Sequence, residues 1–254
     1  MRILVPLPDK DFDVTEVSVP WRLLTDAGHE ITFATEQGGQ APEGDPRLLD
    51  GVLFGQLGAQ AEAKEFYRQL TQAPQYQTPI AWHDIRPADY DGLILPGGHA
   101  PGMRQYLEGT ALRDKVAEFW SLERPVSAIC HGVLVLARTF DSRTLDSPTP
   151  RSVIADRRTT CLPKYLERIG YYLTAWRLGS YYRTYPEYVE DEVKQSLNHP
   201  AQFVRGPRTV SRGSSDDHGP AFVVQDRNYL SARWPGDAYL FAERFLAMLD
   251  KQSL

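Results

Sequence analysis

Residues 126–140 read Val126-Ser-Ala-Ile-Cys-His-Gly-Val-Leu-Val-Leu-Ala-Arg-Thr-Phe140. The apolar run that ends at Cys130 is typical of a strand buried on both faces in a parallel sheet. His131-Gly132 leads directly from it into a helical pattern over 133–140. A buried strand that passes into a helix within two residues indicates an α/β protein.

The chain around this stretch alternates in the same way. Short loops between the segments favour a doubly wound, mostly parallel sheet with helices on both faces. Strands are expected at 2–6, 30–35, 126–130, 221–224 and 229–233, and within 92–98, where the strand ends in a Pro-Gly-Gly turn. Helices are expected at 17–26, 61–70, 110–122, 133–140 and 237–249, and an extended loop at 38–58. Gly28 would stop the first helix, and Asp237 is a plausible cap for the last one.

Composition narrows the class of protein. The 254 residues carry 28 Lys and Arg against 33 Asp and Glu, which gives a net charge of −5 and argues against nucleic acid or an anionic membrane as the main partner. The chain has no apolar run near the ~18 residues of a membrane span, and Pro6 interrupts the first apolar residues before a signal peptide could form. We therefore expect a cytoplasmic protein with one main domain over 1–254.

The sequence has only two cysteines, Cys130 and Cys161. Two are too few for a disulfide scaffold, and the six histidines show no zinc-type spacing, so no metal site is expected. No phosphate-binding glycine motif indicates a nucleotide cofactor. Each thiol is therefore either an inert core residue or a reactive group.

Cys130 lies where a reactive group would be displayed. A nucleophile between an apolar strand and a helix, followed closely by glycine, is the pattern of a nucleophile elbow, and the helix N-terminus would help to hold a thiolate. His131 is adjacent and could serve as base. The alternative is a buried cysteine that ends a strand, with His131 capping the next helix. The turn favours a reactive Cys130.

Two further features could meet Cys130 at the same edge of the sheet. Pro96-Gly97-Gly98 ends another strand, and its backbone N–H groups could form an oxyanion site, although a plain turn explains the glycines equally well. Glu16 follows the first strand and can project to the same edge. From the residues alone, Glu16 is better explained as a first-turn glutamate that favours the helix dipole.

A long segment interrupts the alternation after Asp141, and we expect an inserted lid or subdomain at about 141–215. Its part from 161 to 188 is unusually aromatic. The aromatic residues are Tyr165, Tyr171, Tyr172, Trp176, Tyr181, Tyr182, Tyr185 and Tyr188. Amphipathic aromatics suit a lid, a subdomain or an oligomer surface, and ordinary packing of an insertion explains them as well.

Taken together, Glu16-Val-Ser-Val-Pro20, Gly92-Leu-Ile-Leu-Pro-Gly-Gly98, Ala128-Ile-Cys-His-Gly132 and Ser231-Ala-Arg-Trp-Pro-Gly236 resemble the ThiJ/PfpI superfamily, which includes DJ-1. The resemblance covers 1–140 and 220–250 and is nearest to the heat-shock chaperone/glyoxalase III-like and PfpI-like branches. It implies a flavodoxin-like fold of the class I glutamine amidotransferase type, in a homodimer.

The resemblance also implies roles for individual residues. Cys130 would be the nucleophile, His131 the general base, and Glu16 a protonated acid hydrogen-bonded to the sulfur. The N–H groups of Gly98 and His131 would bind an oxyanion. The substrate-binding residues would be Gly97, Gly98, His99, Gly132 and, in a polar cluster near the C-terminal strands, His218.

One position departs from the family pattern. Lys164 follows Leu162-Pro163 where the chaperone/glyoxalase branch has an aspartate that orients the histidine. The orienting acid could instead come from a neighbouring subunit or from another carboxylate of the chain. The candidates are Asp156, Glu167, Asp216 and Asp217.

The resemblance implies a cysteine-dependent enzyme that acts on a small carbonyl or amide compound. The expected activity is glyoxalase III-like, converting a 2-oxoaldehyde to a 2-hydroxy acid without a cofactor, or amidase- or peptidase-like. The alternative from another class is a redox sensor or holdase chaperone with an oxidisable Cys130. An inactive copy that mainly forms an assembly is a third possibility that Lys164 keeps open.

Overall fold

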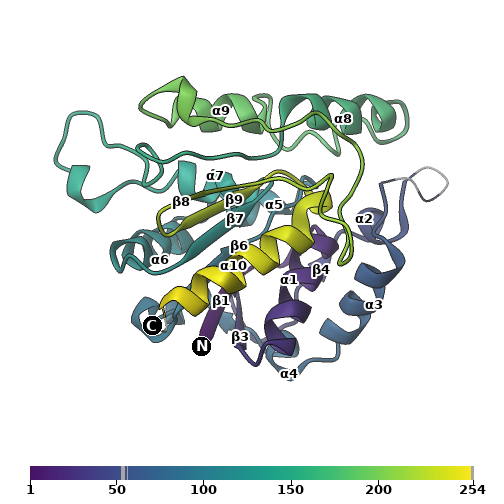
Figure 1. Ribbon diagram of the computed structural model, residues 1–254, viewed down its shortest axis with the longest axis horizontal. Helices are drawn as coiled ribbons and strands as arrows, with labels where there is room; N and C mark the ends of the chain where they lie inside the picture. The colour runs from purple at the N-terminus through teal and green to yellow at the C-terminus, as the bar shows by residue number, and fades with distance from the viewer. Residues whose placement is uncertain (53–54, 56, 253–254) are drawn as a thin grey trace.

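The computed structural model describes residues 1–52, 55 and 57–252. Its centre is a seven-stranded sheet, in which every pair of neighbouring strands is parallel except the last (Figure 1). The strands are, in spatial order, β5 (Ile80–Ala81), β3 (Glu30–Thr35), β1 (Arg2–Pro6), β6 (Gly92–Leu95), β7 (Val126–Ile129), β9 (Tyr229–Ala232) and β8 (Val223–Asp226). Residues of β6 and β7 are buried throughout, as their unbroken apolar runs predict.

Helices cover both faces of this sheet. On one face α1 (Val14–Asp26) packs against α3 (Ala61–Leu70) and α10 (Ala238–Gln252). Helices α5 (Met103–Glu108), α6 (Thr110–Ser121) and α7 (Gly132–Ala137) pack together on the other face. The flavodoxin-like, doubly wound architecture expected from the sequence is confirmed.

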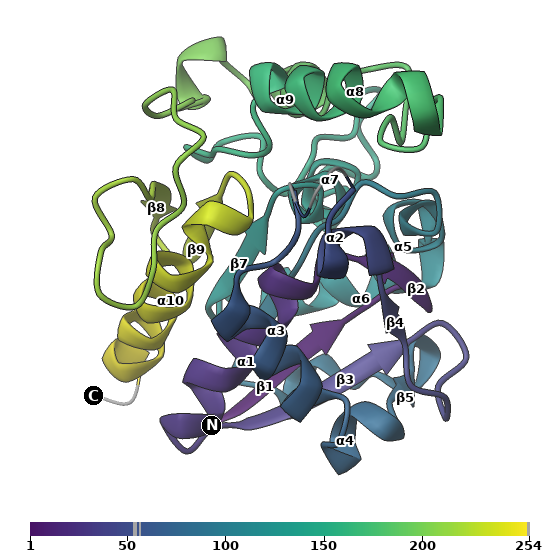
Figure 2. The same cartoon turned by 90° about the vertical axis from the view of Figure 1, so that its right-hand side faces the viewer.

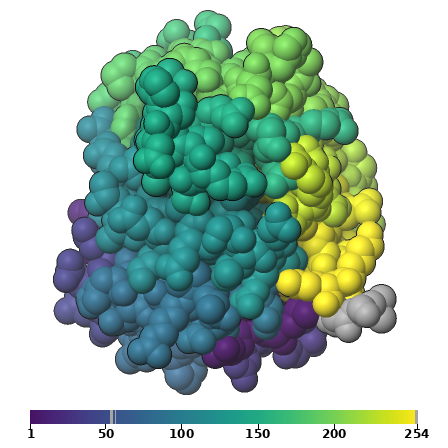
Figure 3. Space-filling model, turned by 90° about the vertical axis from the view of Figure 1, so that its left-hand side faces the viewer, coloured from purple at the N-terminus to yellow at the C-terminus, as the bar shows by residue number. Residues whose placement is uncertain are grey.

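The expected insertion lies across the end of the sheet. Helices α8 (Lys164–Leu178) and α9 (Val189–Gln195) sit beyond the carboxyl ends of the parallel strands in both cartoon views (Figures 1 and 2). In the space-filling view green residues lie along the top of the molecule, above teal residues of the middle of the chain (Figure 3). Ligands of open α/β sheets bind at this end, so the insertion covers the place where a site is expected.

The segment 38–58 is more ordered than expected. It contains β4 (Glu43–Gly44) and the short helix α2 (Pro46–Asp50), and β4 pairs with β2 (Lys10–Phe12) in a second small sheet. Asp45 accepts a hydrogen bond from the Arg47 N–H, and proline fills the first helical position, so Asp-Pro was a readable helix start. The expected loop also includes Leu53, Phe54 and Gln56, which lie outside the described residues.

Several boundaries differ from the expectation. The helix expected over 133–140 ends at Ala137, and the strand expected over 221–224 spans Val223–Asp226. The strand that begins at Gly92 ends at Leu95, directly before the expected Pro-Gly-Gly turn. Asp237 does not cap the last helix; both its oxygens accept hydrogen bonds from the buried Arg233. Short elements complete the described chain: α4 (Pro74–Gln77) and 3₁₀ turns at Trp82–Asp84, Pro87–Asp89, Ser142–Thr144, Pro200–Gln202 and Pro235–Asp237.

The main hydrophobic core lies between the sheet and its helices. It includes Cys161, whose side chain is fully buried. Within the described part of the chain, no helix is both long and apolar enough to cross a bilayer.

Candidate active site

Cys130 occupies a strained turn between β7 and α7. Its φ of +57° lies in the left-handed region that side chains other than glycine rarely adopt. The close packing around the turn depends on glycine, because a Cβ on Gly132 would lie 2.0 Å from the Leu95 carbonyl oxygen and one on Gly97 would lie 2.7 Å from the His131 nitrogen. The nucleophile elbow expected from the sequence is therefore present in its geometry.

His131 lies beside the thiol, and its other nitrogen contacts a threonine. The Cys130 Sγ is 3.5 Å from His131 Nδ1, and His131 Nε2 is 3.4 Å from the Thr184 hydroxyl. That hydroxyl donates its only proton to the His99 carbonyl oxygen at 2.8 Å, so it can only accept from His131. The neutral ring therefore carries its proton on Nε2 and presents the Nδ1 lone pair to the thiol.

Thr184 contacts His131 where an orienting carboxylate was expected. Arg104 donates from both Nε and Nη2 to the Thr184 carbonyl, at 2.9 and 2.6 Å, and thereby fixes this part of the insertion. Lys164 begins α8 and pairs with Asp191 instead of entering the site. No motif marks Thr184, because one threonine among aromatic residues has no distinctive spacing.

The four carboxylates considered for this role make no hydrogen bond to His131 in the described part of the chain. Asp156 pairs with Arg227, Glu167 accepts the Val189 N–H, and Asp217 accepts the Gly219 N–H. The expectation of an orienting carboxylate from this chain is therefore corrected to a hydroxyl group.

Glu16 lies inside the elbow, although the residues alone favoured a helix-dipole role. Its side chain is fully buried, and its Oε2 accepts the Gly97 N–H at 2.8 Å. Burial, with the neighbouring Asp13, raises the pKa of Glu16 well above its usual value, against smaller opposing contacts with Gly97 and the Cys130 thiol. Burial therefore favours the neutral carboxyl group. Because Oε2 is the acceptor, the proton belongs on Oε1, which has no hydrogen-bond partner among the described residues.

The backbone N–H groups near Cys130 have two different roles: one holds Glu16, and the others are available at the site. The Gly97 N–H is used by Glu16, so Gly97 is a close-packed spacer and not an oxyanion donor. The Gly98 N–H has no partner among the described residues, and the His131 N–H points at the Cys130 sulfur. These last two are the groups that the resemblance implies for an oxyanion.

Burial favours the neutral forms of both Cys130 and His131. Burial raises the pKa of the Cys130 thiol, with further increases from Glu16 and Asp13 when these are charged, while the His131 N–H lowers it. Burial also lowers the pKa of His131 well below 6.5. The expectation of a resting thiolate is corrected to a neutral thiol facing a neutral imidazole.

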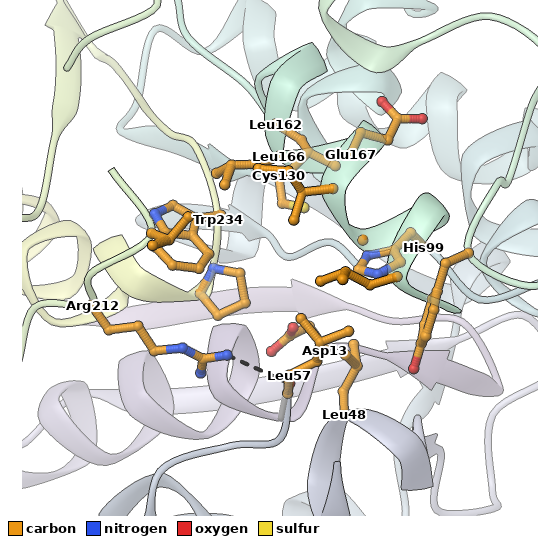
Figure 4. A pocket seen from close by; sticks show the side chains of 16 residues that line it. Asp13, Leu48, Leu57, His99, Cys130, Leu162, Leu166, Glu167, Arg212 and Trp234 are labelled. Carbon is orange, nitrogen blue, oxygen red and sulfur yellow. Dashed lines mark hydrogen bonds between the residues drawn. The ribbon is translucent and has the colours of Figure 1, made fainter. Parts of the chain in front are cut away.

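Cys130 opens into a cavity of about 390 Å³ (Figure 4). Its apolar wall comes mainly from α2, α8 and the segments beside them. The apolar lining residues are Leu48, Leu57, Leu162, Leu166, Ile169, Leu173, Val210, Trp234 and Pro235. The polar lining consists of Asp13, His99, Cys130, Glu167, Tyr182 and Arg212. Of this polar set, Cys130 and His99 were expected as site residues and Glu167 as a candidate to orient His131. Asp13, Tyr182 and Arg212 were not assigned to the site, because they come from a turn and from the insertion.

His99 reaches the cavity as expected. Its ring stacks on that of His131, with centroids 5.7 Å apart, and meets the edge of Tyr182 at 4.5 Å. Burial lowers the pKa of His99 to about 4, so it is neutral at pH 7, and its Nδ1 has no partner among the described residues. His99 can therefore offer a hydrogen bond to a bound molecule.

His218 is not among the residues that line the cavity. Its Nε2 lies 3.3 Å from Glu243 Oε1 on α10, because the turn that carries it folds back toward that helix. The role expected for His218 at the pocket is therefore wrong. Within the described residues, no group of three or more His, Cys, Asp or Glu side chains has the arrangement of a metal site.

A cysteine at a strained strand–helix turn, with a histidine and a buried glutamate beside it on a doubly wound sheet, defines a class of cysteine-elbow α/β proteins. The model of the "ThiJ/PfpI family-like" group matches residues 7–207. The chain belongs to this family.

Individual relatives span nearly the whole chain. A protein of Schizosaccharomyces pombe is 28% identical over 247 residues, which is 96% of this chain and 82% of the relative. A deglycase of Pyrococcus abyssi is 23% identical over 253 residues, covering 98% and 99% of the two chains. The crystal structure of glyoxalase III from Candida albicans matches with a TM-score of 0.69 and 19% identity over 98% of this chain and 97% of that one, a likeness in fold.

Proposed function

We propose that the protein is a cysteine-dependent enzyme that acts on small carbonyl compounds, in a glyoxalase III-type reaction without an external cofactor. The observation that carries the proposal is the 3.5 Å approach of Cys130 Sγ to the unprotonated Nδ1 of His131 beside a 390 Å³ cavity. Relatives named as a deglycase and a glyoxalase III support a carbonyl compound as the first substrate to test.

The first step joins the thiol to an aldehyde. The Cys130 sulfur attacks the aldehyde carbon of a 2-oxoaldehyde, and the thiol proton moves to His131 Nδ1 as the S–C bond forms. The developing oxyanion accepts hydrogen bonds from the N–H groups of Gly98 and His131. Return of the proton to that oxygen gives a hemithioacetal.

The remaining steps move two protons within the bound molecule and add one water. A base removes the proton from the sulfur-bearing carbon while the former ketone oxygen gains a proton, which gives an enediol. A proton is then added to the former ketone carbon as the hydroxyl group on the sulfur-bearing carbon loses its proton, which leaves a thioester on Cys130. Water then cleaves the S–C bond, and the thiol is regenerated as the 2-hydroxy acid leaves. In sum, one 2-oxoaldehyde and one water give one 2-hydroxy acid.

Glu16 supports this chemistry as a neutral acid. Its Oε1 hydrogen can be donated to the sulfur or to a substrate oxygen, while Oε2 stays bound to Gly97. A charged carboxylate at the same place would oppose negative charge on the sulfur, so the raised pKa of Glu16 favours catalysis.

Methylglyoxal consumption, with lactate as the product, tests the proposal. The wild-type protein should turn over methylglyoxal, and Cys130→Ala should abolish turnover. Cys161→Ala is the matched control, because Cys161 is equally buried and lies outside the cavity lining. Equal rates of methylglyoxal consumption by wild type and Cys130→Ala would refute the proposal.

Hydrolysis of an amide or peptide is a second reaction that the same residues could perform. The thiol would attack an acyl carbon, His131 would protonate the leaving amine, and water would release the acyl group. Release of ammonia or amine from small amides, lost in Cys130→Ala, would favour this reaction over the isomerisation.

A holdase or redox sensor is the alternative from another class, and one observation favours it. Helix α8 exposes four large apolar residues, of which Ile169 and Leu173 also line the cavity: Ile169 (41%), Tyr172 (61%), Leu173 (45%) and Trp176 (73%). Such a patch can bind unfolded chains. Under mild peroxide the alternative predicts a mass gain of two oxygen atoms on Cys130 without carbonyl turnover, and suppression of client aggregation that Trp176→Glu weakens.

A further inference from the structure

Arg212 is a cation in the cavity that the reaction above does not use. It comes from the loop between α9 and β8, and it lines the same cavity as Cys130 (Figure 4). Most of the wall around it is apolar, including Leu48, Leu162 and Trp234. A charged group in such a wall needs a physical explanation.

The Arg212 guanidinium group has almost no partners in the described part of the chain. Its one hydrogen bond runs from Nη2 to the Leu57 carbonyl oxygen, at a long 3.5 Å, and the group lies 5.6 Å from the centre of the Trp234 ring. No carboxylate oxygen of the described residues lies within 4.0 Å of it. Five N–H donors are available on a guanidinium group, and the described residues accept from one of them.

Two other arginines with buried or partly buried side chains are paired with carboxylates. Arg233, which is fully buried, donates to both oxygens of Asp237 and to two backbone carbonyls. Arg138, which is partly buried, donates to both oxygens of Glu192. The chain thus supplies carboxylates to these two arginines but leaves the one in the cavity without such a partner.

The nearest acid does not neutralise Arg212 by direct contact. Asp13 also lines the cavity, but its Oδ1 accepts the N–H groups of Thr15 and Glu16 and caps α1. Burial raises the pKa of Asp13 to about 6, with Arg212 acting in the opposite direction. Arg212 remains charged, because guanidinium groups do not lose their proton in proteins.

We propose that Arg212 binds the carboxylate of a substrate whose carbonyl group reacts at Cys130, which makes acidic 2-oxoaldehydes the preferred substrate class. The planar fork of donors matches two carboxylate oxygens, and the apolar wall accommodates the carbon chain between the two ends. The reaction part rests on the proposed function; binding of the carboxylate does not.

Activity measurements compare one acidic and one neutral substrate. The acid is dioxovalerate, a 2-oxoaldehyde with a terminal carboxylate, and the control is its neutral amide. The wild-type kcat/KM should favour the acid by about tenfold or more, mainly through KM. In Arg212→Gln the ratio of the two values should fall to about one, and Arg212→Lys, which keeps the charge but not the fork, should restore part of it. No preference in wild type, or an unchanged ratio in Arg212→Gln, would overturn the proposal.

A binding measurement separates this proposal from the proposed function. Levulinate has the carboxylate and the ketone but no aldehyde, and levulinamide is its neutral partner. Calorimetry should show that wild type binds levulinate more tightly than levulinamide, and that Arg212→Gln, checked for an unchanged melting temperature, weakens levulinate binding by about tenfold. If this holds while no 2-oxoaldehyde is turned over, the carboxylate site stands and the glyoxalase reaction is wrong. If 2-oxoaldehydes are turned over while wild type and Arg212→Gln bind levulinate equally tightly, the proposed carboxylate site is refuted.

Discussion

Thr184 determines which nitrogen of His131 carries the proton. Its hydroxyl donates to the His99 carbonyl oxygen and accepts from Nε2, which leaves Nδ1 free to take the thiol proton. In the proposed reaction, Thr184 acts through the histidine and not through the substrate. It is a positioning residue, and it comes from the insertion.

Replacement of Thr184 by valine should therefore slow the chemistry more than it weakens binding. Without the acceptor, the ring can also carry its proton on Nδ1, where it cannot accept one from Cys130. We expect kcat to fall about tenfold or more with little change in KM, and Thr184→Ser to recover most of the loss. Equal kcat values for Thr184→Val and wild type would show that the hydroxyl does not hold the tautomer.

The raised pKa of Glu16 predicts how its contribution to the stability of the fold changes with pH. Its pKa is raised in the folded protein, first by burial and then by Asp13, so the unfolded chain releases this proton at lower pH than the folded chain does. Its contribution to stability is complete below about 4.5, the usual value, and declines as the pH rises toward the folded-state pKa. Glu16→Gln lacks this decline.

Thermal unfolding of both proteins from pH 5 to pH 8 checks the sign. The melting temperature of Glu16→Gln minus that of wild type should increase steadily across the range. A difference that stays constant or decreases would mean that Glu16 is ionised in the folded protein.

Site residues that lie next to a strand end could be predicted from the sequence, whereas those brought to the site by tertiary packing could not. Cys130, His131 and Gly98 are recognisable because each lies at or next to a strand end. The residues alone favoured a helix-dipole role for Glu16, and only the family resemblance placed it beside the sulfur. Asp13 also begins a helix but carries no signal of its own. Thr184 and Arg212 reach the site only through the packing of a long insertion, which no spacing in the sequence encodes.

Among the elements, the turn from β7 into α7 carries the greatest steric constraint. The β6 strand approaches α7 so closely that a Cβ on Gly132 would stand 2.0 Å from the Leu95 carbonyl oxygen. A backbone atom cannot rotate away as a flexible side chain can. The elbow therefore requires glycine at this position.

Gly132→Ala should lower the free energy of unfolding by about 1–3 kcal/mol or more, measured by urea titration. Gly170 in α8 is the matched control, since a Cβ there meets nothing within 4 Å. Alanine is the better helix former, so Gly170→Ala should raise stability by about 0.5–1 kcal/mol. The close packing at the elbow would be refuted by equal effects at the two glycines.

Helices and strands that bury continuous apolar or amphipathic stretches were predicted more accurately from the sequence than short elements. Strands β1, β6 and β7 and helices α1, α6 and α10 were expected close to their observed positions, because continuous apolar runs and amphipathic patterns mark them. Helix α2 was missed because it spans only Pro46–Asp50, too short for a periodic pattern, although its Asp-Pro start was visible. Strand β5 has two residues and takes its structure from pairing with β3.

On the scale of the whole molecule, the insertion both closes the cavity and leaves an apolar surface. Tyr182 lines the cavity and Thr184 contacts His131, while Ile169, Tyr172, Leu173 and Trp176 repeat along α8 and are exposed, Ile169 and Leu173 also at the cavity. The homodimer implied by the family resemblance stays a prediction, and this stripe is the surface we expect to mediate it.

Sedimentation velocity tests that expectation. The wild-type chain should sediment as a dimer, and the double variant Tyr172→Glu/Trp176→Glu as a folded monomer, because charges on both sides of an apolar contact cannot be buried without partners. A monomeric wild type would contradict the homodimer, and a dimer unaffected by the substitutions would place the interface elsewhere.

The central claim is that Cys130 is the reactive thiol and that the carbonyl substrate binds against it. Peptide mapping by mass spectrometry after limited iodoacetamide treatment tests this most directly, because Cys161 provides an internal control in the same molecule. The account predicts that Cys130 is alkylated much faster than Cys161, and that dioxovalerate or methylglyoxal protects Cys130 in wild type. Equal alkylation of the two cysteines, or labelling of Cys130 that no carbonyl compound slows, would contradict it.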